Sequence, residues 1–540
     1  MQNYFHVIKQ FRRFAKQRMQ PEEAIATARK LIKERVAARE TSFLNLVKKG
    51  IFENSCSPYL NLLQAKKIGF TDLESWVSSD GIEAGLRTLE REGVFLTVDE
   101  FKGRVPVRRN GNEFRCEPGM FDNPFLSHAY EVRSGATRSE GTRIRVDFDY
   151  LHQRSLYDAL LLDAHGCLTA PVANWFPVFP GAPGINSSLR FAHIGNPVRR
   201  WFSQVDEHKL DVGLERKWGK KLLYVLSALH GCPLADATYV SLNEARTVAE
   251  WAAQTLKAHG RCVVYTFAAS AVRVCIAAAE AGLDIKGTKF LVTGEPLTPQ
   301  KKKEIESAGA SAVPVYGISE VGVIAAGCNV SYPQSDHCHL YQDTTAVITH
   351  QHKVPHSETT VGSYLFTTLL CESPKLLLNV DMGDFGDLRA DTCTCPLGQV
   401  GFDMCLSNIR SYEKLTGEGV TFVNADFVWI IEKKLPDTYG GKSTDYQVVE
   451  EEDDKGIPHL RLLVSPRVGP VNEAEVGKTF IRLLKRAEDR GWAQSGTEMW
   501  KQAGMVRVVR EFPIATASGK ILPFYLSTPR GQAPAITKAA

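Results

Sequence analysis

Four short segments of the chain combine glycine with hydroxyl or charged side chains, and the first of them is rich enough in glycine and hydroxyl groups to suit an anionic ligand. A loop rich in glycine and hydroxyl groups can present backbone N–H groups and Ser/Thr hydroxyls to phosphate oxygens. Taken singly, such a segment is more typical of a plain loop. In chain order the four are residues 134–142 (SGATRSEGT), 316–320 (YGISE), 381–384 (DMGD) and 517–520 (ASGK).

A group of cysteines and histidines offers a second kind of chemistry. Cys328 is followed by His337, Cys338 and His339, and then by a Cys-x-Cys pair at 393 and 395. Thiolates and imidazoles are the ligands that tetrahedral zinc prefers, and this group contains enough of them for one ion. Free thiols without a metal are the alternative. Most of the cysteines are expected to be small buried hydrophobic residues.

The elements that would position these residues follow an alternating pattern between about 150 and 330. Helical patterns over 151–162 and 245–258 alternate with strand-like runs at 261–267 and 289–293, which predicts a layered α/β domain. Strand-like runs at 346–349, 363–369 and 376–380 then predict a smaller β-rich subdomain.

The end of the chain changes character and predicts a compact α+β module. Strand-like residues 446–449 and 459–464 flank the acidic segment 450–456, which predicts a hairpin with a solvated turn. A helix is expected over about 473–489 and a further strand at 506–509. The first forty residues carry basic side chains at near-helical spacing, which favours surface helices over a membrane-binding or partner-binding segment.

The composition excludes several classes of protein. The chain has 540 residues, with 65 Lys and Arg against 61 Asp and Glu, so its formal charge is only +4 and gives no reason to expect a nucleic-acid partner. Its length excludes a disulfide-stapled miniature fold, and its scattered cysteines are typical of a reducing compartment. We expect no membrane span and no secretory signal, and therefore a soluble cytoplasmic protein.

Taken in order, the four segments resemble the adenylate-forming superfamily of acyl- and aryl-CoA synthetases, adenylation domains and luciferases, most closely its phenylacetate-CoA-ligase-like branch. Further similarity lies in residues 57–59 (SPY) with Asp72-Leu73, in 291–299 (LVTGEPLTP), and in 408–420, which resembles the interdomain hinge motif. The resemblance implies a large N-terminal α/β domain over 1–408 and a small mobile α+β domain over 409–540. Within the large domain, 1–100 would be helical and about 340–408 would be the β-rich subdomain.

The resemblance also implies a reaction, in which ATP activates a carboxylic acid as its acyl adenylate. Because a carboxylate must attack a phosphate, the site needs both a metal ion and a protein cation. By resemblance, Glu320 would hold Mg²⁺, Tyr316 would lie against the adenine, and Asp384 would accept hydrogen bonds from the ribose hydroxyls. Asp381 and Asp387 are nearby competitors for that role, since the family's usual Arg-x-Gly-Asp reads Asp-Met-Gly-Asp here.

Lys520 would be the catalytic lysine, with its ammonium bridging the carboxylate and the α-phosphate. It lies in the small domain, which would rotate away after adenylation to admit the second substrate. Arg410 at the hinge would contact ribose or phosphate. The remaining nucleotide-binding residues that the resemblance implies are Ser134, Gly135, Thr137, Gly294, Glu295, Pro296, Gly317 and Ser319.

The Cys/His group also resembles a zinc-binding feature of the phenylacetate-CoA-ligase-like proteins. The resemblance implies a structural Zn²⁺ held by Cys328, His339, Cys393 and Cys395, with no position open to substrate. His337 or Cys338 could replace His339.

The phosphate loop departs from its family pattern. The usual proline and lysine are absent, and Glu140 places a negative charge near the phosphates, which Arg138 could offset. Coenzyme A is the default acceptor by resemblance, with a carrier-protein thiol or an amine as the alternatives. Aryl acids are slightly favoured as substrates. A degenerate nucleotide-binding homologue without turnover is the alternative from another class, and the oligomeric state is left open.

Overall fold

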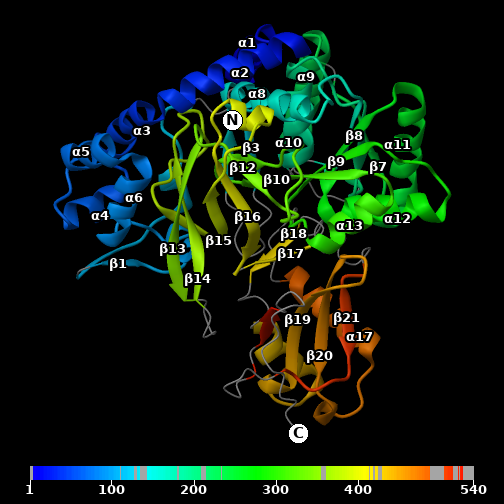
Figure 1. Ribbon diagram of the computed structural model, residues 1–540. Coiled ribbons are helices and arrows are strands. Elements are labelled where there is room, and N and C mark those ends of the chain that lie inside the picture. Colours follow the sequence, from blue (N-terminus) through cyan, green and yellow to red (C-terminus); the bar gives the residue numbers. More distant parts are fainter. Residues whose placement is uncertain are drawn as a thin grey trace.

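The computed structural model describes residues 4–109, 111–126, 130–133, 143–178, 182–207, 214–232, 234–353, 360–412, 414–417, 420–423, 429–486, 504–514, 521 and 523–526. Within them, a large body with a twelve-stranded sheet carries a smaller sheet at the carboxy end of the chain (Figure 1). The predicted α/β class is confirmed.

One half of the large sheet is parallel. Its strands β5 and β8 are buried at every position, as is typical of a parallel sheet covered on both faces. The order across this half is β10-β9-β8-β5-β6-β7. The strands are β5 (Val172–Trp175), β6 (Arg200–Ser203), β7 (Ala237–Tyr239), β8 (Cys262–Phe267), β9 (Thr288–Thr293) and β10 (Ser311–Ile318).

The other half is antiparallel and continues the same sheet from β10 through β11, β12, β16, β15 and β14 to β13. The β10–β11 turn requires glycine at position 322, because φ there is +88° and a Cβ would lie 1.8 Å from the hydroxyl of Tyr150. The strands are β11 (Gly322–Ala326), β12 (Cys338–Leu340), β13 (Thr345–Lys353), β14 (Thr360–Thr368), β15 (Val380–Ala390) and β16 (Met404–Ser411).

Helices cover the large sheet, and the most buried of them is α8 (Phe148–Ala164), which packs against α2. The predicted surface helices of the first forty residues are confirmed, since α1–α3 pack with one apolar face and leave basic residues outside. The remaining helices of the body are α1 (Tyr4–Lys16), α2 (Pro21–Ala37), α3 (Arg39–Val47), α4 (Tyr59–Ala65), α5 (Phe70–Asp80), α6 (Ile82–Arg91), α7 (Val98–Phe101), α9 (Ala182–His193), α10 (Leu214–Leu229), α11 (Ala245–His259), α12 (Ala268–Glu280), α13 (Pro299–Ser307) and α14 (Pro396–Gln399).

The carboxy-terminal part has its own four-stranded sheet in the order β21-β20-β19-β22, with α17 packed against β21. The predicted hairpin is confirmed, because β19 and β20 pair antiparallel along their whole length. These elements are α16 (Leu435–Tyr439), β19 (Tyr446–Glu452), β20 (Pro458–Val464), α17 (Glu473–Arg486), β21 (Val506–Val509) and β22 (Phe524–Leu526). Short two-stranded ladders complete the fold: β1 (Val107–Arg109) with β2 (Asn112–Phe114), β3 (Tyr130–Arg133) with β4 (Arg143–Val146), and β17 (Lys414–Gly417) with β18 (Val420–Val423).

The strand expected at 376–380 is wrong. Only Val380 belongs to a strand, and the preceding residues form a buried irregular segment in which the N–H groups of residues 377–379 bond to side chains. The N–H of Leu378, for example, donates to the hydroxyl of Tyr59 at 3.0 Å. Asn379 adopts a φ of +50°, which a regular strand does not allow. The apolar run therefore reflects burial rather than strand pairing.

The acidic turn of the hairpin is not simply solvated, as the sequence had suggested. Thr298 Oγ1 donates to Glu452 Oε2 at 2.8 Å, so the hairpin contacts the start of α13 in the large body. A Cβ at Gly456 would lie 2.8 Å from the backbone nitrogen of Lys301, which confirms the close approach. Strand β16 continues to Ser411, beyond the boundary expected at 408. Among the described residues, none of the helices is both long and apolar enough to cross a membrane.

Candidate active site and candidate zinc centre

The side chains of Tyr316 on β10 and Asp384 on β15 meet within the large sheet. The Tyr316 hydroxyl donates to Asp384 Oδ2 at 2.9 Å, although β11, β12 and β16 separate β10 from β15 in the strand order. Burial raises the pKa of the Tyr316 phenol, and the negative charge of Asp384 is the second cause of the increase. The hydroxyl therefore remains protonated and donates. Two of the sequence segments that resemble nucleotide-binding motifs are thereby brought into direct contact.

Asp384 differs from the two neighbouring aspartates that could have replaced it. Asp381 is 1 % exposed, and its carboxylate accepts hydrogen bonds from Ser363 at 2.6 Å and Tyr412 at 2.7 Å. Asp387 accepts from the Asn408 amide at 2.8 Å. Asp381 is therefore occupied by Ser363 and Tyr412, and Asp387 by Asn408 on the neighbouring strand. Asp384 remains as the candidate ribose-binding carboxylate.

Glu320 lies in the turn between β10 and β11, beside that contact in the sequence. It is 3 % exposed, and no described residue forms a hydrogen bond or ion pair with its carboxylate. A carboxylate that no described residue engages can bind a hard divalent cation such as Mg²⁺. Gly317 and Ser319 in the same segment are exposed. The turn therefore fits the magnesium role that the resemblance implies.

Arg410 lies on β16, next to the strand that carries Asp384. In the ladder it pairs with Phe385, and Ser411 pairs with Asp384. Its guanidinium donates to Asp336 Oδ2 at 3.3 Å, and its side chain is 29 % exposed. The arginine is thus close to the candidate nucleotide site but is held by a carboxylate in this conformation.

Glu295 has structural partners of its own, which sequence reasoning missed. Its side chain is fully buried, and one oxygen accepts the N–H of Ala269 at 2.9 Å in the first turn of α12. The other oxygen pairs with the ammonium of Lys301 at 3.1 Å. Adjacent Gly294 is exposed at a φ of +79°. A nucleotide-binding role for Gly294, Glu295 and Pro296 stays a prediction.

Four predicted site residues, Ser134, Gly135, Thr137 and Lys520, lie outside the described residues.

The predicted zinc ligands come together. One ligand atom from each of Cys328, His339, Cys393 and Cys395 lies within 4.8 Å of the others. Cys328 follows β11, His339 is in the middle of β12, and the two later cysteines lie in the turn between β15 and α14. The Sγ atoms of Cys328 and Cys393 are 4.0 Å apart, and Cys395 Sγ is 3.5 Å from His339 Nε2. Three segments that are far apart in the sequence thus bring three cysteines and one histidine together.

Hydrogen bonding around this cluster orients its ligands. His339 Nδ1 lies 2.8 Å from the carbonyl oxygen of Phe402, which leaves Nε2 to face the cysteines, as in many zinc sites. The N–H of Gly398 donates to Cys395 Sγ at 3.3 Å. Residue 398 must be glycine, because a Cβ there would lie 2.0 Å from the carbonyl oxygen of Cys393. Of the alternative ligands, Cys338 contacts the carbonyl of Pro314 instead.

The electrostatics of the cluster favour a thiolate. The hydrogen bond with Cys328, followed by that with His339, outweighs burial and lowers the pKa of Cys395 to about 3. A thiolate is the form of cysteine that binds zinc. His337 also forms a second possible ligand group with His339 and Cys405, but it shares His339 with the first group, and Nδ1 of that ring faces a carbonyl oxygen.

Removal of zinc is expected to destabilise the body of the protein, because β11, β12 and the β15–α14 turn meet at this cluster. We expect about one zinc per chain in protein purified without a histidine tag, and a lower unfolding temperature after chelation or for Cys395→Ser. Cys371→Ser is a matched control, since Cys371 is an exposed thiol outside the cluster. Elemental analysis that finds well under one zinc per chain would contradict the site.

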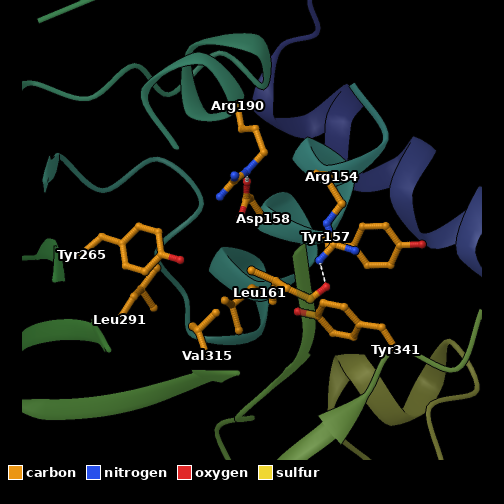
Figure 2. A pocket seen from close by; sticks show the side chains of 10 residues that line it. Arg154, Tyr157, Asp158, Leu161, Arg190, Tyr265, Leu291, Val315 and Tyr341 are labelled. Carbon is orange, nitrogen blue, oxygen red and sulfur yellow. Dashed lines mark hydrogen bonds and ion pairs between the residues drawn. The ribbon is translucent and has the colours of Figure 1, made fainter. Parts of the chain in front are cut away.

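A small cavity of about 10 Å³ lies between α8 and the β8–β11 face of the sheet (Figure 2). Charged residues Arg154, Asp158 and Arg190 line it together with Tyr265. The sequence did not indicate these charged residues as pocket residues. The one sequence signal for these residues was the spacing of positions 154, 158 and 161, which places their side chains on the same face of a helix.

The sequence matches no family model and no curated protein. Solved structures similar to it include a 2-hydroxyisobutyryl-CoA ligase (15 % identity, 93 % of this chain and 88 % of that chain, TM-score 0.49). An o-succinylbenzoate-CoA synthetase from Bacillus subtilis (12 %, 81 % and 79 %, TM-score 0.41) and an amide bond synthetase from Marinactinospora thermotolerans (12 %, 80 % and 76 %, TM-score 0.37) are also similar.

By name, two of these structures are a CoA ligase and a CoA synthetase, and the third is an amide bond synthetase. None of the three is a phenylacetate-CoA ligase. At these identities and TM-scores the likeness assigns no activity, so the functional argument depends on the residues of the chain itself.

Proposed function

We propose that the protein is an ATP-dependent adenylate-forming ligase that activates a carboxylic acid and passes the acyl group to a thiol. The observation that supports this most is the 2.9 Å contact between Tyr316 and Asp384, with the buried residue Glu320 in the turn that follows the strand of Tyr316. Residues that are 68 positions apart in the sequence meet, and both belong to segments with a nucleotide-binding resemblance.

In the proposed first step, a carboxylate oxygen of the acid attacks the α-phosphorus of ATP. A bond forms between that oxygen and phosphorus, the bond to the bridging oxygen of pyrophosphate breaks, and pyrophosphate leaves with the electron pair. Asp384 would hold the ribose and Tyr316 would contact the base. Glu320 would hold Mg²⁺, which supplies positive charge to the phosphate oxygens. Lys520 would stabilise the charge that develops between the two reactants.

In the second step, a thiol sulfur forms a bond to the acyl carbon while the bond from that carbon to the phosphate oxygen breaks. AMP leaves with the electron pair, and the thiol proton passes to solvent. Coenzyme A is the proposed acceptor, and the aryl acids favoured by resemblance are the first candidates for the acid. A structural Zn²⁺ at Cys328, His339, Cys393 and Cys395 would take no part in either step, because four protein ligands leave no open position. We further propose that the chain from about 409 onward moves relative to the body between the steps.

A screen of aromatic and aliphatic acids tests this function. We expect acid-dependent AMP release that increases when coenzyme A is added. AMP release without a requirement for coenzyme A would favour a carrier-protein thiol or an amine as the acceptor. If ATP binds but no acid in the panel supports pyrophosphate exchange or AMP release, the degenerate nucleotide-binding alternative replaces the proposal.

A further inference from the structure

The hydrogen bond between Tyr316 and Asp384 gives the tyrosine a task that the sequence motifs do not assign. In the proposed reaction the ring of Tyr316 contacts the base, whereas its hydroxyl donates to Asp384 Oδ2 at 2.9 Å. Among the described residues, none bonds to the other carboxylate oxygen, Oδ1. The candidate ribose-binding carboxylate is therefore held at one of its two oxygens, and Oδ1 is the oxygen that a ligand would meet.

A β-bulge sets the direction of the Tyr316 side chain. Tyr316 pairs with Ala325 of β11, and the register of the two strands shifts between Tyr316 and Gly317. Residue 317 must be glycine, because a Cβ there would lie 2.7 Å from the carbonyl oxygen of Gly322. Bulges commonly turn a side chain toward a binding site, so the fold itself specifies where this hydroxyl points.

The backbone around Asp384 is fixed as well. Asp384 pairs with Ser411 of β16 in the ladder. The carbonyl of Gly383 accepts the N–H of Tyr412 at 3.0 Å and the hydroxyl of Ser411 at 2.8 Å. Because the main chain is held at these points, rotation of the side chain is the main freedom left to Asp384. The hydrogen bond from Tyr316 restricts that rotation.

The chemistry of the two groups makes this restraint effective. Burial, followed by the charge of Asp384, raises the pKa of the Tyr316 phenol, so the hydroxyl stays a donor. A hydrogen bond to an ionised acceptor is stronger than one between two neutral groups. A carboxylate that is already oriented loses less freedom when a ligand hydroxyl donates to it, which favours binding.

We propose that Tyr316 is a positioning residue, whose hydroxyl orients the Asp384 carboxylate so that Oδ1 accepts hydrogen bonds from the ribose of the nucleotide. The inference rests on the proposed adenylate-forming function and adds to the contact between the tyrosine ring and the base. The Tyr316 hydroxyl should matter only for nucleotides that carry ribose hydroxyls, since a sugar without them offers Asp384 no donor.

Two nucleotides that differ only in the sugar test this requirement. AMP is compared with 2′,3′-dideoxyadenosine monophosphate by calorimetric titration, which needs no knowledge of the acid. For the unmodified protein we expect AMP to bind about 10- to 100-fold more tightly, the usual effect of hydrogen bonds to a charged acceptor. The ratio of the two affinities measures what the ribose hydroxyls contribute.

Tyr316→Phe removes one oxygen atom and keeps the ring. It is expected to weaken AMP binding by about 3- to 10-fold, the effect of having to order one side chain on binding, and to leave binding of the dideoxy nucleotide within about 2-fold. The affinity ratio therefore falls. In an Asp384→Ala background the same substitution should change the AMP affinity by less than about 2-fold, because the carboxylate to be oriented is gone.

Tyr364→Phe is the matched control. The Tyr364 hydroxyl donates to the carbonyl of Asp387 at 2.9 Å, so this variant also removes a tyrosine hydrogen bond to β15, but one that does not involve Asp384. It should leave the affinity ratio unchanged even if it lowers the stability of the protein. A smaller folded fraction changes the stoichiometry of a titration and not the ratio of two affinities.

The outcomes separate this inference from the function on which it rests. A ratio that falls in Tyr316→Phe but not in Tyr364→Phe supports the inference. An unchanged ratio in Tyr316→Phe, or an equal fall in the control, overturns it and leaves nucleotide binding intact. Equal affinity of the unmodified protein for the two nucleotides refutes the ribose role of Asp384 and the inference with it, even if no variant folds. Absence of nucleotide binding overturns the proposed function.

Discussion

Replacing Lys520 by alanine is expected to slow acid-dependent ATP–pyrophosphate exchange by about 10²–10³-fold, the usual effect of removing one oriented donor from a site where charge develops. The reason is chemical. Carboxylate and phosphate are both negative, so their approach needs a cation. The interaction of that cation with the two groups is strongest in the transition state. The thiol-transfer step starts from a mixed anhydride in which that repulsion is already overcome. Transfer from preformed acyl adenylate should therefore largely survive the substitution.

The two half-reactions are measured separately, by pyrophosphate exchange and by thioester formation from synthetic acyl adenylate. Lys478→Ala is the matched control in the same part of the chain, because Lys478 is 74 % exposed on α17 and, among the described residues, pairs with Glu475 alone, at 2.9 Å. It should change neither rate. Equal loss of both half-reactions in the Lys520 variant would refute the assigned role.

Replacing Lys301 by alanine is expected to lower the free energy of unfolding by about 3–5 kcal/mol, since removal of one partner of a buried ion pair leaves an uncompensated charge. The Lys301 side chain is 2 % exposed, and its ammonium lies 3.1 Å from the fully buried carboxylate of Glu295. It also donates to the carbonyl of Pro296 at 3.2 Å and lies 3.4 Å from Glu452 of the hairpin. Denaturant unfolding followed by circular dichroism measures the change.

A double variant separates the lost charge pair from the lost side chain. Lys301→Met with Glu295→Gln removes both charges while keeping the volume, and should recover most of the stability lost on Lys301→Ala. Glu452→Gln is the control, because that carboxylate is 31 % exposed and should cost about 1 kcal/mol or less. A change below about 1 kcal/mol for Lys301→Ala would show that the pair contributes little.

Residue types with strong chemical preferences were the ones that sequence reasoning located best. Cysteines and histidines have few uses in combination, and the four chosen as zinc ligands lie within 4.8 Å of one another. The contact between Tyr316 and Asp384 likewise joins two segments that were chosen for their order along the chain. Binding of zinc and of nucleotide by these residues stays a prediction, which metal analysis and nucleotide titration test.

Residues whose roles depend on distant partners were missed. Lys301 is one of three consecutive lysines, and only the fold shows that it is buried between Glu295 and the hairpin. Arg190 and Asp158 belong to different helices, so no local pattern relates them. The apolar run at 376–380 matched a strand because burial selects the same residue types in a buried irregular segment as in a strand.

Nucleotide binding to the unmodified protein and to Asp384→Ala tests the central claim most directly, because it needs no knowledge of the acid. Calorimetric titration with AMP and with Mg²⁺-ATP is predicted to show one saturable site. Loss of hydrogen bonds to a charged acceptor should weaken that site by about 10- to 100-fold in Asp384→Ala. Asp387→Ala should bind as the unmodified protein does. Absence of nucleotide binding, or equal affinity in Asp384→Ala, would contradict the account.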